Sequence, residues 1–406
     1  MHTALPYIPL IPGLLAAAGI LFCALALWSA RAFTRDARRT PREHPAPPPI
    51  SILKPVKGLD PGLLEALRTH CGQDYPAPFE LLFAVGSLDD PAVPTLRALA
   101  TEFPTLRIET IPTPLTLGAN GKISNLAQLL PHARHPYILI SDADIAVGSR
   151  YLRRITAPFL TPNVGLVTAG YRGRSNPPAN PTLGSRLEAL AIATDFFPGV
   201  LTARLTDRGL HFGLGSTLLV TREALAAAGG LEALTDVLAD DHALGHRIAQ
   251  AGYTVVLSPE PVSTAVPAYT LRGFWNHQLR WARTVRDVRP ASYAGLIFTH
   301  PIPWALLYII ATAGSLPALV LLSLALLARM AVAILIGYSL LRDRQVLRDL
   351  PLLPLRDSFA LALWLWSYAD NTVEWRGQRF RITKGKLLRI GVANSTSAPE
   401  SSRPIH

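Results

Sequence analysis

The chain has 406 residues, of which 49% are hydrophobic and only 17% are charged, and its mean hydropathy is +0.26. This balance points to a membrane-associated protein and disfavours a freely soluble one. The formal net charge is +11. The basic residues flank apolar stretches instead of forming a stripe with interleaved aromatics, which indicates anionic lipid and disfavours nucleic acid as a partner. Cys23 and Cys71 suffice neither for a disulfide framework nor for a zinc site, so we expect a reducing compartment.

Residues 7–30 carry no formal charge and predict an N-terminal transmembrane anchor. A helix of this length would extend about 36 Å, more than the roughly 30 Å of a bilayer's hydrocarbon core. Five arginines follow directly: Arg31, Arg35, Arg38, Arg39 and Arg42. Because positive charge marks the cytoplasmic side, we expect the N-terminus outside and the rest of the main domain in the cytoplasm. Residues 31–49 are basic and Pro-rich and predict a stiff linker.

Residues 50–290 alternate between short apolar runs and amphipathic stretches, which is typical of an α/β domain. Strands are expected at 50–53, 79–85, 106–111, 137–140, 164–169, 218–220 and 254–257, and helices at 61–71, 92–103, 124–130 and 239–250. We therefore predict a doubly wound α/β domain of nucleotide-binding character. Its last part, residues 268–290, is rich in aromatic residues and predicts an interfacial segment.

A second apolar block, residues 301–341, is too long for one crossing and predicts two transmembrane helices. Residues 350–390 contain a shorter apolar piece followed by a basic tail. A full crossing would place that tail on the side that disfavours positive charge, so we favour a re-entrant or interfacial segment, with a crossing as the alternative. Residues 394–406 are polar and predict a disordered end.

The motif Ser141-Asp142-Ala143-Asp144 directly follows the predicted buried strand 137–140. Asp142 and Asp144 are two residues apart, so in an extended chain both carboxylates leave the same side of the backbone. Two such carboxylates repel each other unless a cation intervenes, and a hard divalent ion that also binds substrate phosphates would satisfy both. The alternative is a pair of solvated aspartates that cap the following helix.

Further polar groups follow other predicted elements. Asp89 and Asp90 come after the strand 79–85, Asp240 and Asp241 open the helix 239–250, and the run from His277 to Trp281 lies in the interfacial segment. Since the carboxyl ends of strands in open α/β sheets line ligand sites, we expect these groups to converge.

The ordered set of motifs resembles the membrane-bound family-2-type glycosyltransferases with a GT-A fold. More narrowly, the segments 51–58 (SILKPVKG), 238–241 (LADD) and 277–284 (HQLRWART) are similar to ceramide glucosyltransferases and to the hopanoid-biosynthesis-associated glycosyltransferases of bacteria. The similarity covers nearly the whole chain. Two departures stand out, because the family usually has Gln or Arg at the position of His277 and the ceramide-type pattern has Glu-Asp in place of Asp240-Asp241.

The resemblance implies a role for each motif. Asp144, with Asp142, would hold Mg²⁺ or Mn²⁺, and Asp142 would also lie near the ribose. Asp241 would be the general base, with Asp240 beside it as a substrate contact or helix cap. Arg280 and Trp281 would be the other catalytic residues. The other implied contacts with the substrates come from Lys54, Pro55, Asp89, Asp90, Lys122 and His277.

Among these, Asp89 or Asp90 would meet the uracil ring, while Lys122 and the Pro55 backbone would support the nucleotide. Arg280 would make a bidentate contact with the pyrophosphate, which the point charge of a lysine does not match. Trp281 would line the acceptor entrance. The plain alternatives are a surface lysine for Lys122 and a membrane-interface anchor for Trp281. The segment 213–216 (GLGS) would let the backbone approach the sugar, or would be a simple turn.

These expectations add up to an inverting transferase that moves a sugar from a UDP-sugar to a hydroxyl of a membrane lipid, in the bacterial inner membrane with its catalytic domain cytoplasmic. The resemblance favours N-acetylglucosamine transfer to a hopanoid polyol, with glucose transfer to ceramide as the alternative. A polysaccharide synthase is disfavoured because the predicted spans are too few to enclose a polymer channel. A non-catalytic scaffold that binds nucleotide sugar or lipid is the alternative from another class of protein.

Overall fold

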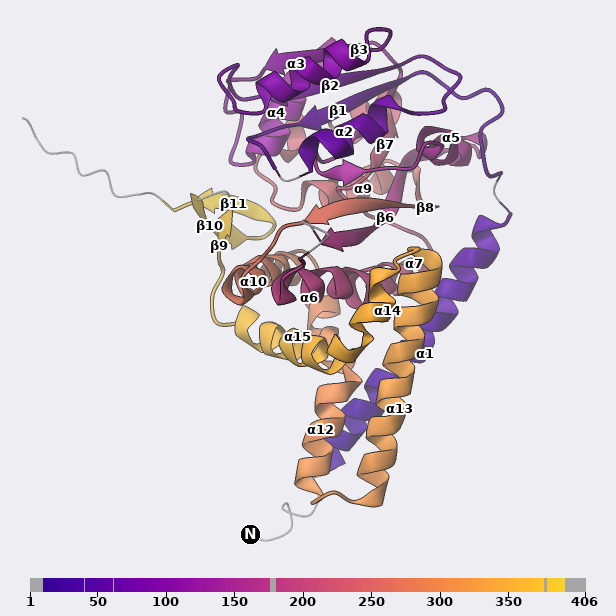
Figure 1. Cartoon of the computed structure of the whole chain (residues 1–406), viewed down its shortest axis with the longest axis vertical. Coiled ribbons are helices and arrows are strands. Elements are labelled where there is room, and N and C mark those ends of the chain that lie inside the picture. The colour runs from indigo at the N-terminus through magenta and orange to yellow at the C-terminus, as the bar shows by residue number, and fades with distance from the viewer. Residues whose placement is uncertain (1–9, 40, 61, 176–179, 376–377, 391–406) are drawn as a thin grey trace, which may run out of the picture.

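Figure 1 shows the computed structural model of the chain, which describes residues 10–39, 41–60, 62–175, 180–375 and 378–390. The predicted disordered end at 394–406 and the first three residues of the predicted anchor lie outside these ranges. A mixed sheet forms the centre of the globular part. Its strands are β1 (Ile50–Pro55), β2 (Phe79–Val85), β3 (Arg107–Pro112), β4 (Tyr137–Ile140), β5 (Ile145–Ala146), β6 (Val164–Ser175), β7 (Leu218–Thr221) and β8 (Thr254–Val266).

The strand order is β3-β2-β1-β4-β7-β6-β8-β5. The first four strands in this order are parallel, whereas β7 runs antiparallel to both β4 and β6. Neighbouring residues of β1 enter different cores: Ile52 packs on one face of the sheet and Leu53 on the other. Both faces are therefore buried, as the continuous apolar runs predict, and the doubly wound mixed α/β fold is confirmed.

Helices cover both faces of the sheet: α2 (Leu63–Cys71), α3 (Val93–Glu102), α4 (Gly121–Leu129), α5 (Tyr151–Thr156), α8 (Arg222–Ala227) and α9 (Asp240–Gln250). Two strands are longer than their sequence pattern indicates, since β6 reaches Ser175 and β8 reaches Val266. These two pair in parallel far beyond the rest of the sheet. Their extension lies towards the membrane helices (Figure 1) and carries residues to the site described below.

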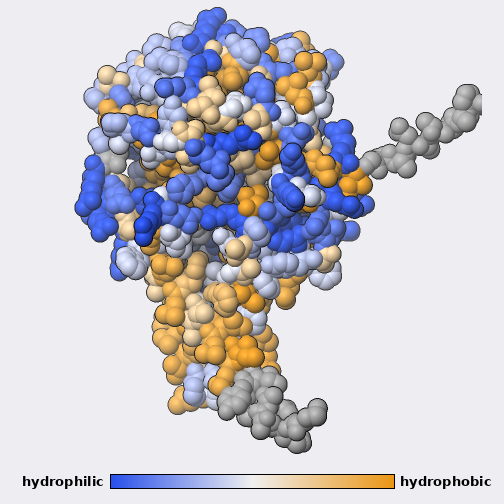
Figure 2. All heavy atoms as spheres, turned by 180° about the vertical axis from the view of Figure 1, so that it is seen from behind, coloured by the Kyte–Doolittle hydropathy of each residue, from blue (hydrophilic) through white to orange (hydrophobic). Residues whose placement is uncertain are grey.

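Three apolar helices project from the globular part: α1 (Leu10–Ala37), α12 (Pro301–Ala311) and α13 (Leu316–Val332), the last continued by the π-helical turn η7 (Ala333–Leu340). Their outer surface is almost continuously hydrophobic in Figure 2. By length and composition, two described helices, Leu10–Ala37 and Leu316–Leu340, are able to cross a membrane. A third span results if the bent pair Pro290–Phe298 and Pro301–Ala311 counts as one. The chain is therefore membrane-associated.

Between the sheet and the projecting helices lie α6 (Leu183–Ala191), α7 (Phe197–Thr206), α10 (Leu271–Val288), α14 (Gln345–Asp349) and α15 (Leu353–Ser367). The π-helical turn η4 (Ile192–Phe196) joins α6 to α7. The sequence pattern predicts no element at 183–206. In Figure 1, α15 lies crosswise to α13, which is consistent with an interfacial segment. Its location in a membrane stays a prediction.

The sequence predicts no secondary structure for the basic tail within residues 350–390. The tail forms an antiparallel sheet of β9 (Thr372–Trp375), β10 (Gln378–Thr383) and β11 (Lys386–Arg389). Phe380 and Leu387 from this sheet pack against Leu238, and the N–H group of Leu238 donates to Gly385 O (3.3 Å). The C-terminal sheet therefore rests on the loop that leads into Asp240 and Asp241.

Candidate active site

A buried lysine, Lys54, binds the loop that follows β4. Lys54 is fully buried, and its Nζ atom donates to Ser141 Oγ (3.2 Å) and to the backbone oxygen of Asp142 (2.9 Å). Burial lowers the pKa of Lys54 to about 7, although the carboxylates of Asp144 and Asp142 act in the opposite direction. Lys54 thus positions the Asp142 loop from inside the protein, and its burial leaves it no direct contact with a substrate of the kind that the resemblance implies.

Lys122 joins two of the acidic motifs. Its Nζ atom lies 2.8 Å from Asp142 Oδ1 and 3.2 Å from Asp240 Oδ2. Burial would lower the pKa of Lys122, but the carboxylates of Asp142, Asp240 and Asp241 raise it above its ordinary value. Only 13% of the side chain is exposed, so the alternative of an ordinary surface lysine does not fit.

Asn120 fixes the start of α4 beside the second acidic pair. Its Oδ1 atom accepts the N–H of Ile123 (3.2 Å), and its Nδ2 atom donates to Val237 O (2.8 Å) and Asp240 Oδ1 (3.4 Å). The N-cap of α9 is Ala239, with no side-chain cap, so Asp240 is not the helix cap considered above. Its carboxylate faces Asn120 and Lys122 instead.

Asp241 lies in a separate environment. Its Oδ2 atom accepts the N–H of Gly215 (2.8 Å), and its Oδ1 atom accepts the N–H of His242 (2.7 Å). Burial raises the pKa of Asp241 to about 6, Asp240 adds to this rise, and Lys122 opposes it. A buried carboxylate with a pKa near neutrality is suited to accept a proton from a substrate hydroxyl.

Gly215 lies where the two acidic motifs meet. A Cβ atom at this position would stand 3.3 Å from both Asp142 Oδ2 and Asp241 Oδ2, and 3.7 Å from Lys122 Nζ. The segment 213–216 is therefore more than a turn before β7, since its backbone approaches both carboxylates. The tips of β4 and α9 converge on this point.

Asp144 extends the site towards the β6–β8 ribbon. Its Oδ2 atom accepts the hydroxyl of Thr264 on β8 (2.5 Å). Burial raises the pKa of Asp144, and the carboxylate of Asp142 raises it further. The negative charges of Asp142 and Asp144 repel each other, and each carboxylate has oxygen atoms that can still bind a ligand. Such a pair is a suitable donor set for a hard divalent cation. The residues therefore fit the Mg²⁺ or Mn²⁺ site expected at this position.

The residues expected on α10 form a cluster of aromatic and charged groups. His277 Nδ1 lies 3.3 Å from Glu188 Oε1, and the imidazole ring stacks on Tyr269 with 5.2 Å between centroids. Trp281 Nε1 donates to His277 Nε2 (3.4 Å). Burial raises the pKa of Tyr269 to about 12; Glu188 and Asp144 act in the same direction, and Arg280 opposes them. The charges of Asp144 and Arg280 therefore both affect the pKa of Tyr269, which indicates that α10 borders the site.

Asp89 and Asp90, which follow β2, have different roles. The carboxylate of Asp90 accepts N–H groups from Gly58 (3.0 Å) and Ala92 (2.9 Å), so it holds the loop after β1 and the start of α3. Asp89 is exposed and accepts the Ser87 hydroxyl (3.1 Å). Of the two, Asp89 keeps an oxygen for a ligand. Pro55 ends β1.

Four residues of the site escaped the sequence patterns: Asn120, Tyr171, Glu188 and Thr264. Burial raises the pKa of Tyr171 well above its ordinary value, and the carboxylates of Asp241 and Glu188 add to this effect. Tyr171 and Thr264 lie on the parts of β6 and β8 that extend beyond the predicted strands. No spacing in the sequence connects these residues to the acidic motifs.

A second charged cluster lies among the helices next to the membrane part. Asp195, His300 and Asp357 each place an atom within 4.8 Å of the others, as metal ligands would. However, Arg329 Nη2 lies 2.6 Å from Asp195 Oδ1 and 2.7 Å from Asp357 Oδ1, and Arg356 lies 2.9 Å from Asp195. Two guanidinium groups already neutralise the two carboxylates, so this cluster is an ion-pair network and not a metal centre.

Comparisons with known proteins identify the family of the chain. The model of glycosyl transferase family 21 matches residues 11–388. Ceramide glucosyltransferase 3 of Caenorhabditis elegans is 25% identical over 361 residues, 85% of this chain and 75% of that protein. Ceramide glucosyltransferase 1 of the same organism is 24% identical over 262 residues, 64% of this chain and 53% of that protein.

Among solved structures, the mannosyltransferase PcManGT from Pyrobaculum calidifontis, in complex with GDP-Man and Mn²⁺, is similar with a TM-score of 0.52 and 20% identity. The match covers 87% of this chain and 99% of that one. It shows a shared GT-A-type fold. Since the family model spans most of the residues, the chain belongs to glycosyl transferase family 21 and is a membrane glycosyltransferase.

Proposed function

We propose that the chain transfers glucose from UDP-glucose to the hydroxyl of a ceramide-type membrane lipid, with inversion at the anomeric carbon. The observation that carries the proposal is the convergence of Asp142, Asp241 and Lys122 at the backbone of Gly215 in a chain of this family, with Asp240 paired to Lys122. Several curated relatives are named ceramide glucosyltransferases. The comparisons give no support to the hopanoid acceptor expected first, so we favour the ceramide alternative.

Each charged group has a task in this reaction. Asp241 accepts the proton of the lipid hydroxyl as that oxygen attacks the sugar. The leaving diphosphate gains negative charge, which Arg280 of α10 would stabilise. Asp142 and Asp144 would hold Mg²⁺ or Mn²⁺, which supplies electrostatic stabilisation of the leaving group. Lys122 keeps Asp142 and Asp240 in position, and Asp89 is our proposed contact for the uracil ring.

The donor and acceptor are tested together in a reconstituted assay. Purified protein in neutral liposomes is given labelled UDP-glucose or UDP-N-acetylglucosamine, with ceramide or a hopanoid polyol as acceptor, and the lipids are separated. We expect labelled glucosylceramide only. Labelled hopanoid would support the hopanoid polyol as the acceptor. If no combination of donor and acceptor gives a labelled lipid, the result would contradict lipid glycosylation.

The pH dependence of transfer reports on Asp241. Its pKa is raised to about 6, and only the deprotonated carboxylate accepts a proton, so the rate should rise with pH through about 6 and then level off. The measurement is kcat/KM for the acceptor between pH ~5 and ~8. A rate that stays constant across this range, as expected for an aspartate with an ordinary pKa near ~4, would argue for a different base.

Gly215→Ala is expected to lower kcat by roughly 10- to 100-fold, since a methyl group beside Asp142 and Asp241 displaces two groups that must stay in register. The matched control is Gly199→Ala, because a Cβ atom at Gly199 meets nothing within 4 Å. Initial rates at saturating donor measure the effect. Equal rates for the two variants would show that the backbone approach has no role in catalysis.

Removal of divalent cations with EDTA is expected to stop transfer, and added Mg²⁺ or Mn²⁺ should restore it. The structural neighbour was solved with Mn²⁺. Asp144→Asn should raise the metal concentration needed for half-maximal rate, because the site loses one anionic ligand. Full activity in EDTA would remove the metal from the proposal.

A further inference from the structure

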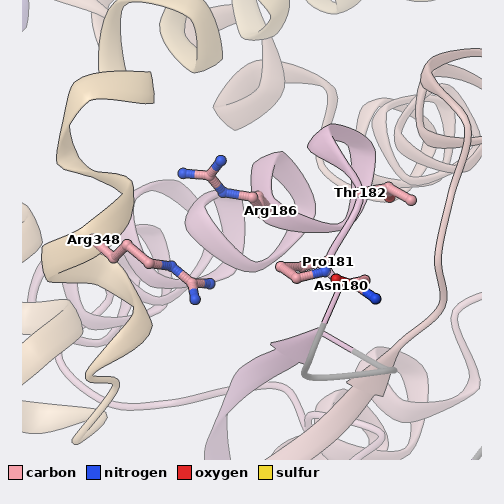
Figure 3. A pocket seen from close by; sticks show the side chains of 5 residues that line it. All are labelled: Asn180, Pro181, Thr182, Arg186 and Arg348. Carbon is pink, nitrogen blue, oxygen red and sulfur yellow. The ribbon is translucent and has the colours of Figure 1, made fainter.

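A groove lined by arginines is formed by residues other than those of the proposed active site. It consists of two adjoining cavities of about 520 and 390 Å³ that share Arg348. Six arginines line them, and we call this feature the arginine groove: Arg172, Arg174, Arg186, Arg342, Arg344 and Arg348. They come from β6, α6, α14 and the loop that follows η7. In Figure 3, Arg186 and Arg348 reach into the space between their two helices from opposite sides.

Much of this positive charge is not neutralised by the protein. The side chains of Arg174 and Arg344 are exposed and form no hydrogen bond or ion pair with any residue that the structure describes. Arg172 donates to the hydroxyl of Ser263 (3.0 Å) and to backbone oxygens of the 341–342 turn, but to no carboxylate. Burial lowers the pKa of Arg172; the nearby Asp343 opposes this shift, and Arg174 and Arg342 add to it.

The remaining arginines share a few carboxylates. Arg186 and Arg348 lie 2.6 and 3.6 Å from the same oxygen of Asp349. Arg342 lies 3.6 Å from Glu260, which is already paired with Arg154 at 2.5 Å. The groove therefore holds more guanidinium groups than carboxylates, and like charges at close range are costly unless an anion lies between them.

The position of the groove indicates where such an anion would come from. Arg342 and Arg344 follow directly after Leu340, the last residue of the candidate membrane span Leu316–Leu340. Residues directly after a span lie at the level of the lipid headgroups, where the phosphate groups are. Guanidinium groups bind phosphate oxygens in a bidentate manner, and several of them together can hold one phosphate group.

We propose that the arginine groove binds the phosphate group of an anionic membrane lipid. This site is distinct from the proposed active site, because consecutive residues of a strand point to opposite faces. Tyr171 packs against Phe196 (5.1 Å between ring centroids), whereas the next residue, Arg172, bonds to Ser263 and the 341–342 turn. A bound phosphate would tie β6 and α6 to α14, and so hold the globular part against the bilayer. The proposal does not depend on which sugar or lipid the active site uses.

The test uses the full-length protein in neutral detergent micelles, titrated with phosphatidylglycerol or with phosphatidylcholine, with bound lipid counted by native mass spectrometry. The unmodified protein should retain phosphatidylglycerol in preference to phosphatidylcholine. The double variant Arg174→Gln/Arg344→Gln should bind phosphatidylglycerol roughly 25-fold more weakly, about fivefold for each arginine near a membrane surface. Both side chains are exposed and unpartnered in the described structure, so its thermal unfolding should be unchanged.

The matched control is Arg97→Gln/Arg134→Gln, which removes two exposed arginines, one on α3 and one in the loop before β4, that line neither cavity. Its affinity for phosphatidylglycerol should change by less than about twofold, because neither arginine lies next to a candidate span. Equal losses in the two double variants, or no loss in either, would overturn the proposal.

In a second arm, inorganic phosphate competes with the lipid. Displacement of the lipid at phosphate concentrations as low as those of the lipid would make free phosphate the ligand and overturn the assignment to lipid.

Discussion

Asp241→Asn is expected to reduce the rate of sugar transfer by about 10²- to 10⁴-fold, the range for loss of a positioned general base. Asp241 is half-buried near Lys122 and Asp240, and it accepts two backbone N–H groups, from Gly215 and His242. An asparagine keeps the shape and one acceptor oxygen but is unable to take a proton. Binding of the UDP-sugar should change little, because the proposed contacts with the nucleotide come from other residues.

Single-turnover rates and donor affinity, measured separately, distinguish loss of the base from loss of the site. Asp74→Asn is the control, since Asp74 is exposed and pairs with Arg153 at 2.8 Å; its rate should equal that of the unmodified protein. In the Asp241 variant, the rise of rate with pH through about 6 should also disappear. Transfer at an undiminished rate would assign the base to another group.

Arg329→Met is expected to destabilise the protein by about 3–5 kcal/mol, the cost of removing one partner from a buried ion pair. Arg329 is only 1% exposed although it lies on a candidate membrane span. Its guanidinium group is bound by Asp195, Asp357 and the backbone oxygen of Thr194 (2.9 Å). Without it, Asp195 keeps its pairing with Arg356, but the buried Asp357 loses its guanidinium partner.

The measurement is a denaturant titration in micelles, with Arg35→Met as the exposed control. The control should change the free energy of unfolding by less than about 0.5 kcal/mol. The double variant Arg329→Met/Asp357→Asn should recover part of the loss, since it removes the stranded charge as well. If the double variant is no more stable than Arg329→Met, the loss comes from packing and not from charge.

This ion-pair network also shows how the membrane part is joined to the catalytic part. Arg329 on α13 bonds to Asp195 in the π-helical turn between α6 and α7, and Phe196 in the same turn packs edge-on against Trp281 (5.8 Å between centroids). A π-helical turn inside an α-helix is frequent at functional sites. The turn therefore connects a buried charge of the membrane helices to an aromatic residue of α10.

The sequence by itself determined the class of fold, the apolar helices and the acidic tips of the strands. These features follow from local patterns: a continuous apolar run predicts a strand buried on both faces, and a long uncharged run predicts a membrane helix. The sequence also supplied the order of the motifs, which led to the correct family. Asp142 and Asp144 were found this way, because the strand 137–140 ends directly before them.

Only the tertiary structure decided which of these groups meet. It buries Lys54 beneath the Asp142 loop, brings Lys122 between Asp142 and Asp240, and places Gly215 against two carboxylates. It also turns the basic tail into a small sheet beneath the acidic loop. Contacts of this kind join residues that are far apart in the chain, for example 88 positions apart for Lys54 and Asp142. Such contacts leave no periodic signal in the sequence. Burial then sets the charge state of each group, and no local pattern encodes it.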